Sequence, residues 1–116
     1  MDTPMLDQED MEALEILGHV YFRQGRPKEA RIVFEGLLAL APENRTARKH
    51  LAALALERGE GEEALRHLED WNEGKPEGSL EPAALLMRVQ ALRLNGRNSD
   101  AQQVFAAYLR NFEEAQ

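Results

Sequence analysis

The sequence contains no cysteine, which excludes a disulfide framework and any site built on thiolates. Basic residues are also scarce: 14 lysines and arginines stand against 21 aspartates and glutamates, and the formal net charge is −7. A surface that binds nucleic acid needs a basic face to displace counterions from the phosphates. The charge balance therefore argues against nucleic acid and against anionic membrane surfaces as partners.

Long apolar runs are missing as well, since no stretch approaches the roughly 18 residues of a membrane span. The first residues, Met1-Asp2-Thr3-Pro4, lack the basic and apolar segments of a signal peptide. We therefore expect no membrane insertion and a cytoplasmic location. With 116 residues, 43% of them apolar and 30% charged, the composition is typical of one small globular domain.

The stretch from Leu14 to Pro42 has apolar residues at helical spacing on both sides of a glycine. Asp7 is the predicted N-cap of the first helix. Gly25 is predicted to end that helix, because glycine readily adopts the left-handed conformation of a helix terminus. Pro27 then opens a second helix, where the missing backbone donor costs nothing, and Pro42 stops it.

This pattern occurs three times. Gly25 is followed by Gly59 34 positions later and by Gly96 a further 37 positions on. The three extra residues fall in the segment richest in glycine and proline, so residues 72–79 are predicted to form a longer loop before a helix that begins at Pro82. The sequence thus predicts three helical hairpins, or six antiparallel helices.

The helix–turn–helix unit of about 34 residues, with these spacings, resembles the tetratricopeptide-repeat superfamily over residues 11–112. Leu37 and Trp71 depart from its pattern, which prefers alanine there. The resemblance implies an all-α fold, a short right-handed solenoid with a concave groove. We expect one domain over residues 1–116, with a lead-in over 1–10 and repeats over 11–44, 45–78 and 79–113.

Paired helices in such repeats approach closely where small residues face large ones. The expected small positions are Gly18, Ala30, Ala52, Ala64 and Ala101. The side chains expected to fill the gaps between the paired helices are Tyr21, Phe34, Leu68 and Phe105.

Two segments are also similar to the small YscY-type chaperones of bacterial type III secretion. These are residues 25–43 and Leu94-Asn95-Gly96 followed by Ala101. The resemblance implies a cytoplasmic chaperone that binds a helical segment of a small secreted export component and brings it to the export gate. The alternative is a generic bacterial scaffold module that joins two proteins without chaperoning either.

In tetratricopeptide arrays the first helix of each pair lines the concave groove, so the resemblance implies a partner-binding groove. A mixed apolar and polar lining would suit a helix laid along it. The implied groove residues are Ile16, His19, Phe22 and Arg23; Lys49, His50, Ala53 and Leu56; and Leu86, Met87, Gln90 and Leu94, with Ala83 and Arg93 beside the last group.

A second partner surface is expected around Trp71, Tyr108 and Phe112. Trp71 either wedges into the core or serves as an exposed anchor, since tryptophan is enriched at binding hot spots. The last helix needs either a polar outer face of its own or a partner that covers it, and that partner includes a second copy of the chain.

No constellation of catalytic residues is visible. None of His19, His50 and His67 has a second histidine three to five residues away, the spacing of common metal sites. Neither a nucleophile elbow nor a phosphate-binding glycine loop is present. We therefore expect no enzyme activity, cofactor or metal, and we interpret His19 and His50 as polar groove residues that face each other.

Overall fold

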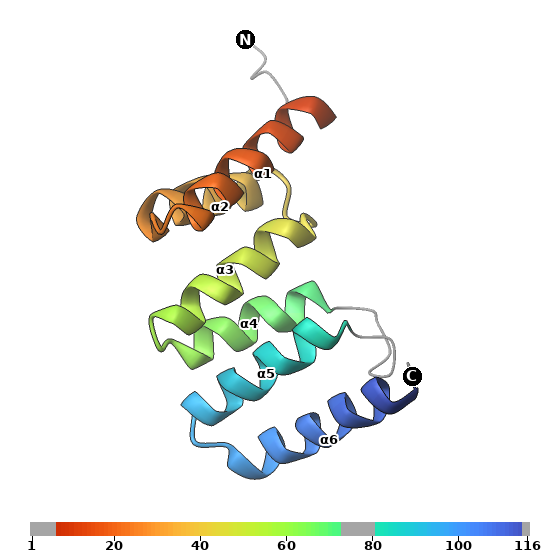
Figure 1. The fold of residues 1–116 in the computed structure, drawn as a ribbon. Helices are drawn as coiled ribbons and strands as arrows, with labels where there is room; N and C mark the ends of the chain where they lie inside the picture. Colours follow the sequence, from red (N-terminus) through yellow and green to blue (C-terminus); the bar gives the residue numbers. More distant parts are fainter. Residues whose placement is uncertain (1–6, 73–80, 115–116) are drawn as a thin grey trace. The chain divides into compact units, whose positions relative to one another are not determined.

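The computed structural model describes residues 7–72 and 81–114, and every regular element within them is an α-helix. The predicted all-α helical-repeat fold is confirmed. The predicted lead-in over residues 1–10 and the predicted loop over residues 72–79 lie largely outside the described residues, and α1 already begins at Gln8. The helices are α1 (Gln8–Arg23), α2 (Pro27–Leu40), α3 (Arg45–Glu57), α4 (Gly61–Trp71), α5 (Pro82–Leu94) and α6 (Asn98–Glu114) (Figure 1).

Helix α1 begins with a reciprocal cap. The side chain of Asp7 accepts a hydrogen bond from the backbone N–H of Asp10 at 2.8 Å. The Asp7 N–H in turn donates to the Asp10 carboxylate at 3.1 Å. Two of the free donors at the helix start are thereby satisfied, and the predicted N-cap at Asp7 is confirmed.

The three pattern glycines form one recurring turn. Gly25, Gly59 and Gly96 have φ angles of 70°, 73° and 73°, and each follows a first helix of a pair. After Gly25, the N–H of Arg26 donates to the carbonyl of Tyr21 at 2.9 Å, and equivalent bonds follow the other two glycines. A side chain at this φ would be strained, so glycine directs the return of each hairpin.

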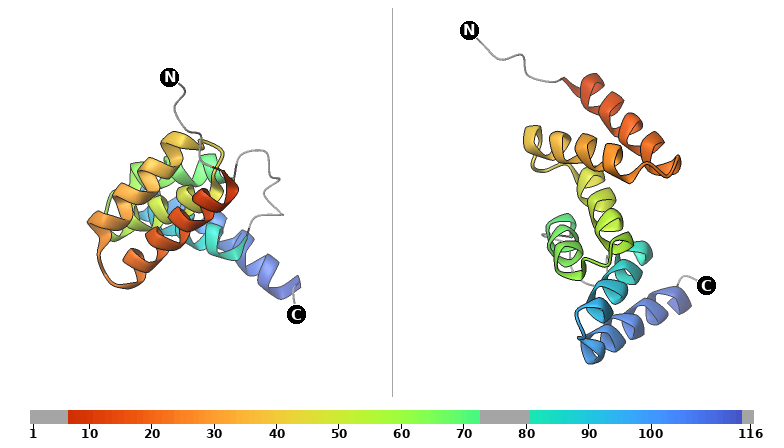
Figure 2. Two further views of the ribbon diagram at one scale, coloured as in Figure 1. Left: turned by 90° about the horizontal axis from the view of Figure 1, so that it is seen from above. Right: turned by 90° about the vertical axis from the view of Figure 1, so that its left-hand side faces the viewer.

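The chain forms two compact units, Met1–Leu51 and Ala52–Gln116, with the boundary inside α3. In the first unit α1 packs along α2 (Figure 2). Phe34 on α2 is 0% exposed and lies against Gly18 on α1. A Cβ at Gly18 would lie 2.6 Å from Cζ of Phe34, so only glycine allows this contact.

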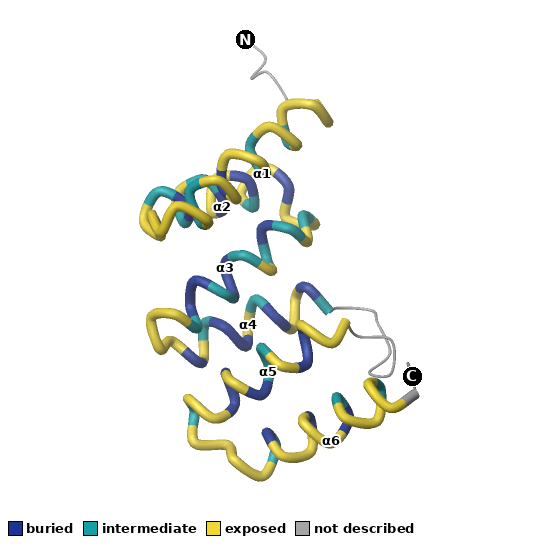
Figure 3. Tube along the Cα trace, viewed as in Figure 1, coloured by how far each residue is buried: buried dark blue, intermediate teal, exposed yellow. Residues whose placement is uncertain are grey.

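The core of the second unit is formed by α4, α5, α6 and the end of α3. Leu68, Leu85 and Leu92 are its largest fully buried side chains, and Trp71 is 4% exposed. At the start of α4, a Cβ on Gly61 would lie only 2.8 Å from the backbone carbonyl oxygen of Ala91 on α5. In Figure 3, α6 is exposed along most of its length.

The third hairpin departs from the expected packing at Phe105, which we predicted would fill the gap between the paired helices. It is 44% exposed, whereas its counterpart Phe34 is 0% exposed. Val89 stands where the first repeat has Gly18, 71 positions earlier. Val89 leaves less room than glycine for a ring between the paired helices, and no described helix follows α6 to cover Phe105 as His50 on α3 covers Phe34.

Candidate functional site

A groove of about 860 Å3 runs between α5 and α6 in the second unit. The pair α5 and α6 lies side by side and is joined by the turn at Gly96 (Figures 1 and 2). The groove is lined by Ala83, Leu86, Met87, Val89, Gln90 and Arg93 on α5 and by Asn98, Ala101, Gln102 and Phe105 on α6.

The groove has apolar walls and a polar rim. Leu86 is 38% exposed and Phe105 44% exposed, while Met87 is partly buried and packs against the core. Gln90 and Arg93 are exposed on α5, one and almost two turns beyond Leu86. This combination offers apolar area to the stripe of an amphipathic helix and polar groups to its flanks.

Part of the predicted binding groove coincides with this site. Leu86, Met87 and Gln90 all line it, as do Ala83 and Arg93. Leu94 is 50% exposed but lies outside the lining set. Ala53 and Leu56 lie half-buried on α3, and Leu56 packs against the core rather than lining this groove.

Sequence reasoning missed the α6 wall, because the resemblance places groove residues on first helices only. The missed residues are Asn98, Ala101, Gln102 and Phe105. One signal for this wall is Val89, which stands at a glycine position 16 residues before Phe105 and leaves less space for the ring.

In the first unit, the predicted residues His19, Phe22 and His50 come together. Nδ1 of His19 lies 3.2 Å from Nε2 of His50, so the two rings do face each other. The ring of Phe22 meets His50 edge-on, with centroids 5.4 Å apart. Phe34 stacks on the ring of His50, with centroids 4.4 Å apart and an angle of 17°.

The hydrogen bonds of His50 define its tautomer. Its Nδ1 lies 2.9 Å from the carbonyl oxygen of Thr46, and a carbonyl can only accept, so Nδ1 carries the proton. Nε2 is then the acceptor for the N–H of His19. Burial lowers the pKa of His50 below its ordinary value, and the bond to Thr46 only partly offsets this effect.

The lowered pKa predicts a pH-dependent stability. The unfolded chain binds a proton at His50 more readily than the folded chain, so the stability from neutral His50 is fully present above a pH of about 6.5 and is lost below it. Urea titrations at pH values from about 7.5 down to about 5.5 should show the free energy of unfolding of the wild type falling with pH. In His50→Phe we expect this slope to be shallower, by at most the contribution of one bound proton. An unchanged slope would contradict this assignment.

The other predicted residues of the first unit lie at the surface. Ile16 is 65% exposed, and Arg23 and Lys49 are also exposed. For the predicted second surface the result is mixed. Trp71 is buried in the core of the second unit, as the first of the two alternatives predicted, and is therefore not an exposed anchor for a partner. Tyr108 is partly buried, and Phe112 is 52% exposed.

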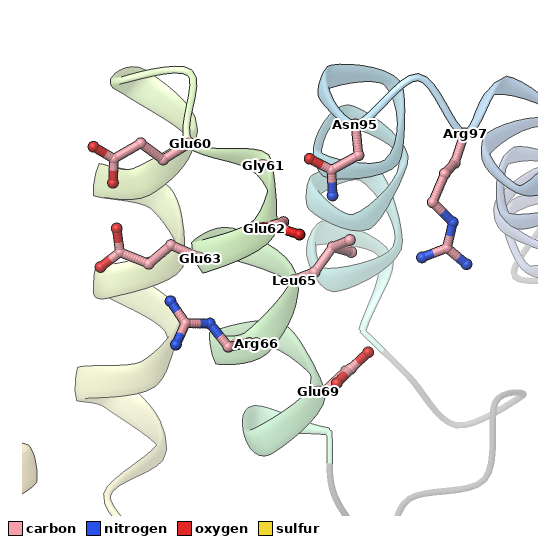
Figure 4. A pocket seen from close by; sticks show the side chains of 9 residues that line it. All are labelled: Glu60, Gly61, Glu62, Glu63, Leu65, Arg66, Glu69, Asn95 and Arg97. Carbon is pink, nitrogen blue, oxygen red and sulfur yellow. The ribbon is translucent and has the colours of Figure 1, made fainter.

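A second depression, of about 1050 Å3, lies over α4 and the turn before α6. Its lining is charged, with four glutamates and two arginines among its residues (Figure 4). In Figure 4 the side chains of Glu60 and Glu63 extend to the opposite side of α4 from Asn95 and Arg97. Both glutamates bind Arg58, and Arg97 binds Asp100, so these charges are already paired.

Within the part of the chain that the structure describes, no three histidine, aspartate or glutamate side chains gather as metal ligands. None of the described helices is both long and apolar enough to cross a bilayer. The helical hairpins and the open apolar groove define the class of the protein, a helical-repeat module for protein–protein interaction.

A family model described as tetratricopeptide repeat matches residues 21–81, more than half of the chain. The protein therefore belongs to the tetratricopeptide-repeat family. The matched segment contains α2, α3 and α4 completely, while the assignment of α5 and α6 to a third repeat comes from the internal spacing. Comparison with curated proteins gives no match.

Proposed function

We infer that the protein is a chaperone of the type III secretion kind, which holds a helical segment of a small secreted protein in the groove between α5 and α6. The observation that carries this proposal is the groove itself, with Leu86 and Phe105 exposed on facing walls. Exposed apolar side chains on both walls are what the apolar stripe of a client helix would cover.

The groove chemistry suits a client rather than a small ligand. The walls are apolar, and the flexible thioether of Met87 adapts to different side chains. Arg93 at the rim is placed to meet an acidic residue on the polar side of the client helix. Burial of apolar area stabilises such a complex by about 25 cal/mol per Å2, less the cost of ordering the client.

A second contact region is proposed in the first unit, at the predicted groove residues His19, Phe22 and His50. The edge of His19 is exposed, and its Nδ1 is occupied by the bond to His50. The ring therefore offers Nε2 to a client as a hydrogen-bonding group.

The assignment to type III secretion rests on the resemblance of residues 25–43, and of Leu94-Asn95-Gly96 followed by Ala101, to the YscY-type chaperones. In that role the protein would act in the cytoplasm, keep its client from aggregating and deliver it to the export gate. The scaffold alternative uses the same groove but joins two proteins that are each stable alone. The two functions differ in what happens to the client when this protein is absent.

The test is co-expression with each small secreted protein encoded beside this gene, followed by pull-down. Leu86→Asp is the variant of choice, because Leu86 is 38% exposed while Leu56 and Met87 pack against the core. We expect the client to be soluble only with the wild type, and Leu86→Asp to weaken retention at least about tenfold, or about 1.4 kcal/mol.

Ile32→Asp is the matched control, since Ile32 is 70% exposed on α2 in the first unit. It should retain the client as the wild type does. A client that stays soluble alone but still binds would favour the scaffold function. Full retention by Leu86→Asp would move the binding site away from this groove.

A further inference from the structure

Helix α1 carries an apolar face that the structure leaves exposed. Ala13, Leu17 and Val20 follow one another at intervals of four and three residues, so they lie on one side of the helix. Ala13 is exposed, and Leu17 and Val20 are 41% and 42% exposed. Two neighbouring branched side chains at this exposure form a patch rather than an isolated apolar residue.

The same face is largely buried in the later repeats, although Arg88, the α5 counterpart of Leu17, is only half-buried. Thirty-four positions after Ala13 and Leu17 stand Ala47 and Leu51 on α3, which are 0% and 3% exposed. Seventy-one positions after Val20 stands Ala91 on α5, which is 0% exposed. The repeat architecture therefore uses this face of each first helix as a packing surface.

On α5, the helix that covers this face is α4, the second helix of the preceding repeat. The two helices approach closely at Gly61, where a Cβ would lie 2.8 Å from the carbonyl oxygen of Ala91 and 2.9 Å from Cβ of Leu94. The α4–α5 contact thus shows, within one unit, how a second helix accepts the first helix of the next repeat.

Helix α6 is the counterpart of α4 in the third repeat and presents an aromatic face. The rings of Phe105 and Tyr108 stack with centroids 6.0 Å apart, and those of Tyr108 and Phe112 with centroids 6.4 Å apart. Phe105 is 44% and Phe112 52% exposed, whereas Leu68, the counterpart of Phe105 on α4, is 1% exposed. Among the described residues, no helix covers this face as α5 covers α4.

We propose that the chain associates with itself head to tail, with α1 of one copy packing on α6 of the next as α5 packs on α4. The partner is a second copy because the same chain carries both an uncovered first-helix face, on α1, and an uncovered second-helix face, on α6. The α4–α5 interface shows how two such faces pack together. Such a contact is heterologous, because it joins two different surfaces. One α1 face and one α6 face therefore remain free at the two ends of the assembly.

Two differences from the α4–α5 contact make the association weaker than the packing within the chain. Asn98 stands where α4 has Gly61, and Val20 stands where α5 has Ala91, so the helices cannot approach as closely at this end. Each copy also carries a net charge of −7, and the repulsion between copies is screened by salt. Association therefore rises with ionic strength.

Sedimentation equilibrium of the purified protein alone tests the proposal. We expect the weight-average mass to rise between about 10 µM and about 1 mM, and to rise further with added salt. Leu17→Asp and Phe105→Asp should each remain monomeric. Because each variant retains the surface that the other lacks, an equimolar mixture should form one-to-one dimers and nothing larger.

Ile32→Asp is the control and should associate as the wild type does. If Phe105→Asp loses helical content, Leu109→Asp replaces it, since Leu109 is 43% exposed on the same helix. A monomeric wild type at every concentration would overturn the proposal. Loss of association in only one of the two variants would also overturn it, because that result indicates a symmetric dimer. A mixture of the two variants that fails to form dimers would overturn it as well. Because no client is present, either result leaves the chaperone function to be decided by its own test.

Discussion

Phe34→Ala is expected to lower the free energy of unfolding by about 3–5 kcal/mol, whereas Phe105→Ala lowers it by roughly 1–2 kcal/mol. The two residues occupy the same place in the repeat pattern, 71 positions apart. Phe34 is 0% exposed and Phe105 44% exposed, so the first substitution leaves a cavity and the second removes a side chain that is partly in water. Unfolding in urea, followed by circular dichroism, measures both.

The surroundings of Phe34 explain its larger contribution. The tip of the ring fills the space left by Gly18, and the ring stacks on His50. A loss of stability equal to that of Phe105→Ala would mean that the two rings are equally packed and would contradict the displaced position of Phe105. Since Trp71 lies in the second unit, circular dichroism rather than tryptophan fluorescence should follow Phe34→Ala.

Local signals in the sequence predicted the elements well. The cap at Asp7 involves a residue three positions away, and the turn at Gly25 depends on the backbone freedom of that one residue. Such features depend on neighbours along the chain, so the pattern of residue types is sufficient. The helical repeat followed directly from these signals, recurring at 34 and then 37 positions.

The sequence predicted that the last helix would need a polar outer face or a covering partner, but it also placed Phe105 in the gap between paired helices, where its counterpart Phe34 is fully buried. Two differences in the surroundings of Phe105 account for its exposure: Val89 replaces glycine across the hairpin, and no described helix follows α6 as α3 follows α2. Burial depends on the sum of both side chains and not on either one. Comparing residue pairs 16 positions apart, rather than single positions, would have revealed the crowding.

Trp71 and the histidines also show that local sequence patterns do not predict tertiary packing. The sequence left Trp71 open between core wedge and exposed anchor, and only the packing of α4 against its neighbours places it in the core. The proximity of His19 and His50 could be expected from the repeat, but the stacking of His50 on Phe34 could not. Tertiary contacts of this kind join residues that no local pattern relates.

Gly61→Ala is expected to destabilise the second unit by about 1–3 kcal/mol, although alanine is the better helix former. A Cβ there would lie 2.5 Å from Oδ1 of Asn95 and 2.8 Å from the carbonyl oxygen of Ala91. The Asn95 side chain can rotate away, but the backbone of α5 cannot, so α4 and α5 must separate. The fluorescence of Trp71, on α4 itself, reports this unfolding.

Gly36→Ala is the matched control for this prediction, because Gly36 lies within α2 and a Cβ there meets nothing within 4 Å. It should raise the free energy of unfolding by up to about 1 kcal/mol, since alanine restricts the unfolded chain and favours the helix. Opposite signs for the two substitutions would establish the close α4–α5 approach as a real contact. Equal gains would show that these helices lie further apart, and the α4–α5 contact would then no longer be a template for packing α1 on α6.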